Sequence, residues 1–180
     1  MNEQKKKKIS KFLSYVLRHH PELIGLNIDE NGWANVDELI TKSTKDSQGF
    51  TFEELDEIVQ TNSKKRFAFN EDKTRIRASQ GHSIDINLAL TPQQPPEFLY
   101  HGTAQNNIDS ILENGIEKRS RQHVHLSIDK ETATNVGMRH GRPIILTIST
   151  EKMFDDGILF YLSENNVWLT DFVDAKYISK

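Results

Sequence analysis

The sequence contains no cysteine among its 180 residues, which excludes disulfide bridges, thiolate zinc sites and thiol nucleophiles. No apolar run approaches the roughly 20 residues that span a bilayer, and the lysine run at residues 5–8 has no apolar core behind it that would make a secretory signal. Neither a Gly-Lys-Ser/Thr phosphate loop nor a G-x-G-x-x-G fingerprint is present. These absences predict a cytoplasmic protein without a membrane partner, a P-loop or a Rossmann site.

The charge balance argues against bulk coating of nucleic acid. The chain carries 23 Lys and Arg against 26 Asp and Glu, a net charge of −3, whereas nucleic-acid-coating proteins are usually basic. Contact with RNA or DNA would therefore need a local basic patch. The lysine run is interpreted as a solvated tail or a frayed helix start rather than a binding arm.

Apolar spacing in the first half of the chain predicts three helices and a hairpin. Residues 9–17 place apolar side chains on one helix face, and Pro21 ends that helix. Three helices followed by a hairpin is the pattern of a winged helix, a module that often binds nucleic acid. The other elements are a helix over 36–40, a helix after a capping box at 51–54, and strands over 66–69 and 74–77 with a turn at 70–73.

A proline-rich segment predicts the boundary between two lobes. Residues 91–96 (TPQQPP) are expected to form a linker between a lobe at 1–90 and a lobe at 97–180. The second lobe has mostly β character. Its expected elements are strands over 98–100, 124–128, 144–148, 167–169 and 177–178, with one helix over 108–112 that ends at Asn114-Gly115.

Basic and hydroxyl-bearing residues gather in short motifs along the chain. Arginine pairs bidentately with phosphate oxygens, and glycine lets backbone N–H groups approach an anion. We therefore infer a phosphorylated, nucleotide-like substrate. Each motif alone has a structural alternative: a helix dipole partner at Arg18-His19, a surface residue at Arg66, a simple turn at 80–83. The motifs are Arg18-His19, Arg66, Gly81-His82-Ser83, His101-Gly102-Thr103 and Arg121 with His125-Leu126-Ser127.

A metal site is not expected. His123 and His125 alternate on a predicted strand and point the same way. No third ligand lies at a spacing typical of zinc sites.

The order of the motifs carries a resemblance that covers the chain from about Ser10 to Tyr177. The motifs are Lys11-Phe12-Leu13-Ser14-Tyr15-Val16-Leu17-Arg18-His19, Gly32-Trp33, Lys65-Arg66-Phe67, Ile76-Arg77-Ala78-Ser79-Gln80-Gly81-His82-Ser83, Tyr100-His101-Gly102-Thr103, Val124-His125-Leu126-Ser127 and Val167-Trp168-Leu169-Thr170. In this order they closely resemble the NAD-dependent RNA 2′-phosphotransferases. The resemblance implies an α+β protein, with an N-terminal winged-helix lobe that engages RNA and a C-terminal, β-rich lobe of ADP-ribosyltransferase-like fold that binds NAD.

The resemblance also implies a reaction in two steps. An internal 2′-phosphate on a tRNA-like RNA, left at a splice junction, attacks the ribose carbon of NAD that bears nicotinamide. The neighbouring 2″-hydroxyl then attacks that phosphate. The products are RNA with a free 2′-hydroxyl, ADP-ribose 1″,2″-cyclic phosphate and nicotinamide.

Residue roles follow from the resemblance in the same way. It implies a 2′-phosphate clamp in which only His19 can transfer a proton near neutral pH. Val167 occupies the place where protein-modifying ADP-ribosyltransferases have a catalytic glutamate. Arg119 is the alternative to Arg121 as the fourth clamp residue. The implied sets are Arg18, His19, Arg66 and Arg121 for catalysis, His101, Gly102, Thr103, His125 and Ser127 for NAD, and Gly81, His82 and Ser83 for the substrate phosphate or RNA.

Two other functions stay open at this stage. The same clamp could transfer ADP-ribose to a terminal phosphate of RNA or DNA. The chain could also be a non-catalytic RNA-binding module with an inert second lobe, although all four basic clamp positions are occupied. We expect a monomer.

Overall fold

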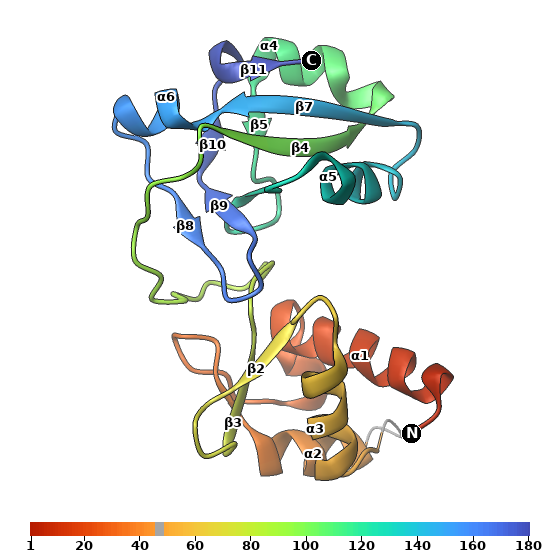
Figure 1. The fold of residues 1–180 in the computed structure, drawn as a ribbon. Coiled ribbons are helices and arrows are strands. Elements are labelled where there is room, and N and C mark those ends of the chain that lie inside the picture. Colours follow the sequence, from red (N-terminus) through yellow and green to blue (C-terminus); the bar gives the residue numbers. More distant parts are fainter. Residues whose placement is uncertain (46–48) are drawn as a thin grey trace. The chain divides into compact units, whose positions relative to one another are not determined.

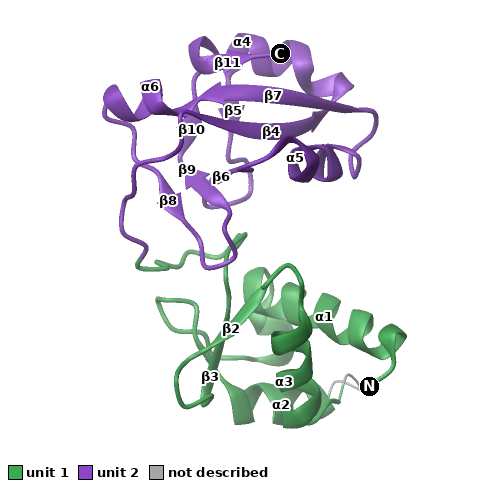
Figure 2. Ribbon diagram, viewed as in Figure 1, with its two compact units in different colours: residues 1–89 green, residues 90–180 purple. Residues whose placement is uncertain are grey.

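The computed structural model describes residues 1–45 and 49–180. The chain divides into two compact units, Met1–Ala89 and Leu90–Lys180 (Figure 2), and each has its own cluster of buried apolar residues. The segment 91–96, expected to be a linker, is bound to unit 2. The N–H of Gln93 donates to the carbonyl of Phe160 over 2.8 Å, and Pro95 is buried.

Unit 1 begins with helix α1 (Glu3–Arg18; Figure 1). The buried residues Ile9, Leu13, Val16 and Leu17 form one face of this helix. The side chain of Asn2 caps the helix by accepting from the N–H of Lys5. The predicted end of the helix is confirmed, since α1 stops at Arg18 and Pro21 opens the short 3-10 helix η1 (Pro21–Ile24).

The second and third helices are α2 (Val36–Lys45) and α3 (Phe52–Thr61). The predicted capping box is confirmed: the N–H of Glu54 donates to the Thr51 hydroxyl, and the Glu54 carboxylate accepts from the N–H of Thr51. Helix α3 buries Leu55 and Ile58 against the core of unit 1.

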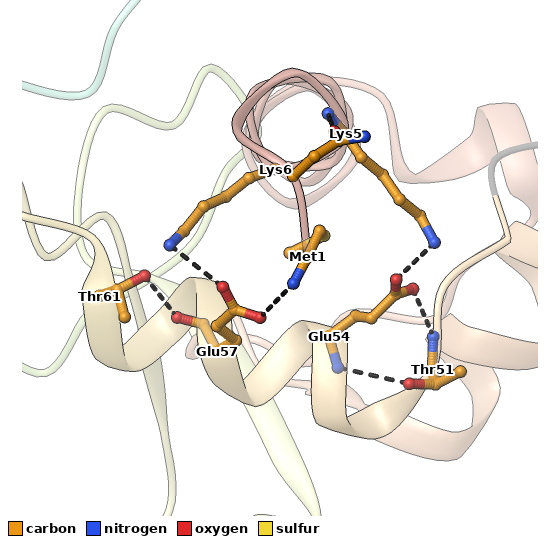
Figure 3. A network of polar contacts seen from close by, with 8 residues as sticks. Met1, Lys5, Lys6, Thr51, Glu54, Glu57 and Thr61 are labelled. Atoms are coloured by element: carbon orange, nitrogen blue, oxygen red, sulfur yellow. Dashed lines mark hydrogen bonds and ion pairs between the residues drawn. The ribbon is translucent and has the colours of Figure 1, made fainter.

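Two residues of the lysine run pair with α3. Lys5 forms an ion pair with Glu54, and Lys6 lies 3.4 Å from Glu57 (Figure 3). The lysine hydrogen bond lowers the pKa of Glu54 below its ordinary range. The run is therefore a helix start rather than a tail. Helix α3 is acidic, with four carboxylates: Glu53, Glu54, Asp56 and Glu57.

The sheet of unit 1 is antiparallel, with strand order β1-β3-β2. Ile76 lies at its centre and is fully buried. The predicted hairpin is confirmed by the pairing of Phe67 with Ala78 and of Phe69 with Ile76. The strands are β1 (Ala34–Asn35), β2 (Phe67–Phe69) and β3 (Arg75–Ala78).

Unit 2 contains three small antiparallel sheets, ordered β11-β7-β4, β6-β9-β8 and β10-β5. The longest pairing joins β4 to β7 from Phe98 opposite Ser149 to Ala104 opposite Pro143, and helix α5 lies against these two strands (Figure 1). The strands are β4 (Phe98–Ala104), β5 (Ile116–Glu117), β6 (Val124–Leu126), β7 (Pro143–Ser149), β8 (Tyr161–Leu162), β9 (Trp168–Thr170), β10 (Phe172–Val173) and β11 (Ile178–Ser179). The helices are η2 (Gln105–Asn107), α4 (Ile108–Asn114), α5 (Lys130–Gly137), α6 (Thr150–Asp155) and η3 (Ala175–Tyr177).

Unit 2 differs from the sequence prediction in its helices. Helices α5 and α6 were not predicted from the sequence. Helix α5 buries only Ala133 and Gly137, so its sequence shows no apolar stripe. Tyr177, expected in a strand, closes the 3-10 helix η3, and strand β11 starts one residue later. Among the described residues, no helix has both the length and the apolar content needed to cross a bilayer.

Candidate functional site

A short segment of unit 1, Ser79–Ser83, connects three residues of the predicted phosphate clamp. The N–H of Ser79 donates to the carbonyl of Arg66 over 2.9 Å, and the N–H of Ser83 donates to the carbonyl of Arg18 over 2.9 Å. Gly81 makes the turn between them, with a φ of 85° in the left-handed region that favours glycine. The segment therefore ties the start of strand β2 to the end of helix α1.

His19 stands at the C-terminal cap of α1, where its N–H donates to the carbonyl of Tyr15 over 3.1 Å. Its ring nitrogen Nδ1 lies 2.9 Å from the hydroxyl of Ser83. A helix C-terminus carries partial negative charge, which favours the neighbouring cation Arg18 in the last turn. Arg18, His19 and Ser83 are thus held together within unit 1 by hydrogen bonds of backbone and side chain.

His82 does not lie on the surface, where a residue that contacts RNA would have to be. Its side chain is 1% exposed, and its Nε2 lies close to Gly32. Neither ring nitrogen has a hydrogen-bond partner among the described residues. Burial, together with the nearby charges of Arg18, His19 and Arg77, lowers the pKa of His82 from 6.5 to about 3. His82 is therefore a neutral residue whose side chain points from the Ser79–Ser83 segment into the interior of unit 1.

The buried state of His82 predicts an acid-sensitive unit 1. Between pH 6.5 and about 3 the unfolded chain binds a proton that the folded chain excludes, so stability is full above pH 6.5 and falls as the pH drops, by about 1.4 kcal/mol for each pH unit. Urea unfolding at about pH 7 and about pH 5.5 should show this loss, since carboxylates scarcely titrate between these values. The variant His82→Gln should lack most of it, and the exposed control His20→Gln should keep it. An equal loss in His82→Gln would contradict the assignment.

In unit 2, two predicted NAD-binding motifs meet at a bridge between strands. Tyr100 and Ser127 exchange both backbone hydrogen bonds, each over 2.8 Å. Next to this bridge, Nδ1 of His101 lies 3.2 Å from the carbonyl oxygen of His125. Burial lowers the pKa of His101, although this hydrogen bond raises it. The structure therefore brings His101, His125 and Ser127 together around one strand junction.

Both candidate arginines belong to this junction. Nη1 of Arg121 lies 2.9 Å from Nδ1 of His125. A guanidinium can only donate, so Nδ1 of His125 accepts, and the ring proton of neutral His125 is placed on Nε2. The charge of Arg119 contributes to lowering the pKa of His101, and Arg119 adopts a φ of 52°, uncommon for a residue with a side chain. Sequence reasoning treated the two arginines as exclusive, whereas each is associated with one histidine of the junction.

Gly102 and Thr103 have packing roles that the motif alone did not indicate. A Cβ atom on Gly102 would lie 1.7 Å from the carbonyl oxygen of Ala133 in α5, so only glycine allows this helix to approach strand β4. Thr103 is 5% exposed, and its hydroxyl accepts from the side-chain amide of Asn107 over 3.3 Å. Among the described residues, no group of three or more His, Cys, Asp or Glu could hold a metal ion.

Two cation–π contacts beside these motifs were not predicted from the sequence. The guanidinium of Arg77 stacks over Trp33 at 4.5 Å from the ring centroid, next to His82. The ammonium of Lys130 lies 5.5 Å from the ring centroid of Tyr100. Arg77 and Trp33 both stand in the motifs that carried the resemblance, which was the available signal. Nothing in the sequence spacing links Lys130 to Tyr100.

Comparison with known proteins places these motifs in one family. The family model described as "RNA 2'-phosphotransferase, Tpt1 / KptA family" matches residues 4–172. A protein of Flavobacterium johnsoniae named "Probable RNA 2'-phosphotransferase" is 61% identical over 178 residues, 99% of this chain and 98% of the relative. A protein of the same name from Fusobacterium nucleatum is 58% identical over 172 residues, 95% of this chain and 96% of the relative. With nearly its whole length matched, the chain belongs to the RNA 2′-phosphotransferase family.

Proposed function

We propose that this chain transfers an internal 2′-phosphate from RNA to NAD, through an ADP-ribosylated RNA intermediate. The observation that carries the proposal is the Ser79–Ser83 segment, which fixes Arg66 on one side and Arg18 with His19 on the other. Arg and His side chains whose backbone is fixed by hydrogen bonds are suited to bind a dianionic phosphate. A phosphate clamp within an RNA 2′-phosphotransferase family member identifies the RNA 2′-phosphate as the group that it would hold.

In the first step the clamp orients the nucleophile. The leaving nicotinamide is a cationic pyridinium, so its departure needs little acid catalysis. The step needs an RNA phosphate oxygen placed in line with the ribose carbon, which is a problem of orientation entropy. Arg18 and Arg66 keep their charge throughout and supply that placement from unit 1. Val167 stands where other ADP-ribosyltransferases have a catalytic glutamate, and an attacking group that is already an anion needs no such base.

In the second step the 2″-hydroxyl attacks the phosphodiester and charge builds on the phosphate. Preorganised arginines stabilise that charge, and the family resemblance implies this role for Arg18, Arg66 and Arg121. His19 is the clamp residue that can move a proton near neutral pH. The step releases RNA with a free 2′-hydroxyl and ADP-ribose 1″,2″-cyclic phosphate.

We assign NAD to the strand junction of unit 2. The Nε2–H of neutral His125 and the Ser127 hydroxyl can serve the ribose hydroxyls, and the half-buried ring of His101 is oriented by the carbonyl of His125. Gly102 and Thr103 then support the site through packing. We also propose a winged-helix fold for unit 1, supported by its three helices and hairpin, and an ADP-ribosyltransferase-like fold for unit 2, with a monomer as the working unit.

The test is incubation of the purified protein with a short RNA bearing one internal 2′-phosphate, with and without NAD. We expect NAD-dependent loss of the phosphate and formation of ADP-ribose 1″,2″-cyclic phosphate. Stable ADP-ribosylated ends on a 5′-phosphorylated oligonucleotide, with no change to the internal 2′-phosphate, would instead indicate transfer to terminal phosphates. Salt-dependent RNA binding without NAD turnover would indicate a non-catalytic binding module.

Alanine variants of Arg121 and Arg119 should differ in how strongly they slow the second step of the reaction. Arg121→Ala is expected to slow the second step about 100-fold or more, the usual cost of removing a preorganised donor, so that ADP-ribosylated RNA accumulates. Arg119→Ala should have less effect on that step. Gel analysis of 5′-labelled RNA over time measures both. Accumulation of the intermediate with Arg119→Ala alone would mean that Arg119 is the fourth clamp residue.

A further inference from the structure

Ser83 contacts the end of helix α1 through two different groups. Its N–H donates to the carbonyl of Arg18 over 2.9 Å, and its hydroxyl lies 2.9 Å from Nδ1 of His19. The first contact satisfies one of the last helical carbonyls, which have no partner within the helix. The second reaches the imidazole of the next residue. One serine thus binds the backbone of one clamp residue and the side chain of its neighbour.

The backbone hydrogen bond of Ser83 stabilises the contact between its hydroxyl and His19. Ser83 is exposed, and an exposed hydroxyl alone would exchange its partner for water. Here the Gly81 turn and the buried ring of His82 anchor the segment immediately before Ser83. The hydroxyl is therefore presented to His19 by a backbone that is anchored just before Ser83 and at its own N–H.

We propose that Ser83 is a positioning residue for His19 and holds its imidazole in one orientation, with Nε2 available for the reaction. This inference rests on the proposed function. It differs from the role in substrate contact that the sequence implies for Ser83, because the hydroxyl is directed at a ring nitrogen of the clamp itself.

A serine hydroxyl suits a histidine that must change its protonation state. The hydroxyl oxygen can accept from Nδ1–H both in the imidazolium and in the neutral tautomer that carries its proton on Nδ1, so Nε2 is free to gain or lose a proton. A carboxylate in the same place would favour the charged form alone. Ser83 can therefore keep its contact with His19 on both sides of a proton transfer at Nε2.

The test is a double-mutant cycle measured in single-turnover assays with 2′-phosphorylated RNA and NAD. Ser83→Ala is expected to lower the rate of the second step roughly five- to tenfold, the value of one neutral hydrogen bond, with the RNA KM unchanged. Ser83→Thr, which keeps the hydroxyl, should restore the rate. In a His19→Ala background, Ser83→Ala should cost nothing further. Ser10→Ala, which removes a hydroxyl elsewhere on α1, should leave the rate unchanged.

Two outcomes would overturn the inference. An equal loss in the wild-type and His19→Ala backgrounds, or a raised RNA KM, would show that Ser83 contacts the substrate. An unchanged rate in Ser83→Ala, with wild-type protein active, would show that the contact is idle.

A second measurement does not depend on activity. Nitrogen-15 NMR of the His19 ring should show one neutral tautomer in the wild-type protein and a mixture in Ser83→Ala. Identical ring spectra would overturn the inference even if the wild-type protein transferred no phosphate.

Discussion

Replacing Gly102 by alanine is expected to destabilise unit 2 strongly. The new Cβ would lie 1.7 Å from the carbonyl oxygen and 2.6 Å from the carbonyl carbon of Ala133. These are backbone atoms, so no side-chain rotation relieves the clash, and α5 must move away from β4. We expect a loss of at least about 3 kcal/mol, the upper end of overpacking costs, out of the 5–15 kcal/mol typical of a domain. Thermal unfolding followed by circular dichroism measures it.

Gly49→Ala is the matched control, since a Cβ there would make only ordinary contacts, the shortest 3.5 Å from Thr44. Gly137→Ala should fall between the two, because its Cβ would lie 3.0 Å from the carbonyl oxygen of Thr103. If Gly102→Ala unfolded like the wild type but no longer bound NAD, the glycine would serve the nucleotide directly. If the variant is instead less stable than the wild type, its loss of activity is explained by lost packing and not by a catalytic role of Gly102.

Replacing Arg18 by alanine is expected to uncouple the two steps of the reaction. The residue stands in the last turn of α1, with Nε and Nη2 buried beneath the surface. Its charge should matter most when the phosphate gains charge in the second step, so we expect that step to slow about 100-fold or more. The branched, ADP-ribosylated RNA should then accumulate in a gel time course.

Lys7→Ala, which removes one positive charge from the exposed side of the same helix, controls for bulk electrostatics and should behave as wild type. Added guanidinium offers a check on the fold, because partial rescue of Arg18→Ala would require an intact site. Equal slowing of both steps, with weaker RNA binding, would instead mean that Arg18 binds the substrate uniformly and does not act on the second step.

Local signals predicted much of unit 1. The apolar face of α1, the stop at Pro21 and the capping box at Thr51 each depend on residues a few positions apart. The burial of His82 could not be predicted in this way. Its environment includes Gly32 and Arg18, which are distant in sequence, as well as the nearby Arg77, and a histidine between glycine and serine suggests a surface turn. The site residues therefore stay predictions from the sequence pattern, and only the packing shows what surrounds each of them.

In unit 2 the same distinction explains why helix α5 was not predicted. The start of α5 is signalled by Asp129, whose side chain accepts from the N–H of Thr132 over 2.6 Å, but small residues form the face that packs on β4. Sequence periodicity detects large apolar side chains and misses an interface made by glycine and alanine. The contact between α5 and Gly102 therefore became visible only in three dimensions.

The acidity of helix α3 bears on how unit 1 would meet a polyanion. Three of its four carboxylates accept from Lys5, Lys6 or Lys73, so these lysines are already engaged within the protein. A nucleic-acid strand laid along α3 would release few counterions and would meet carboxylates instead of cations. Under the proposed function, the attraction comes instead from Arg18, His19 and Arg66, none of which belongs to α3. A clamp of this kind would select RNA by the phosphate at one nucleotide, and contacts between the strand and α3 would add little.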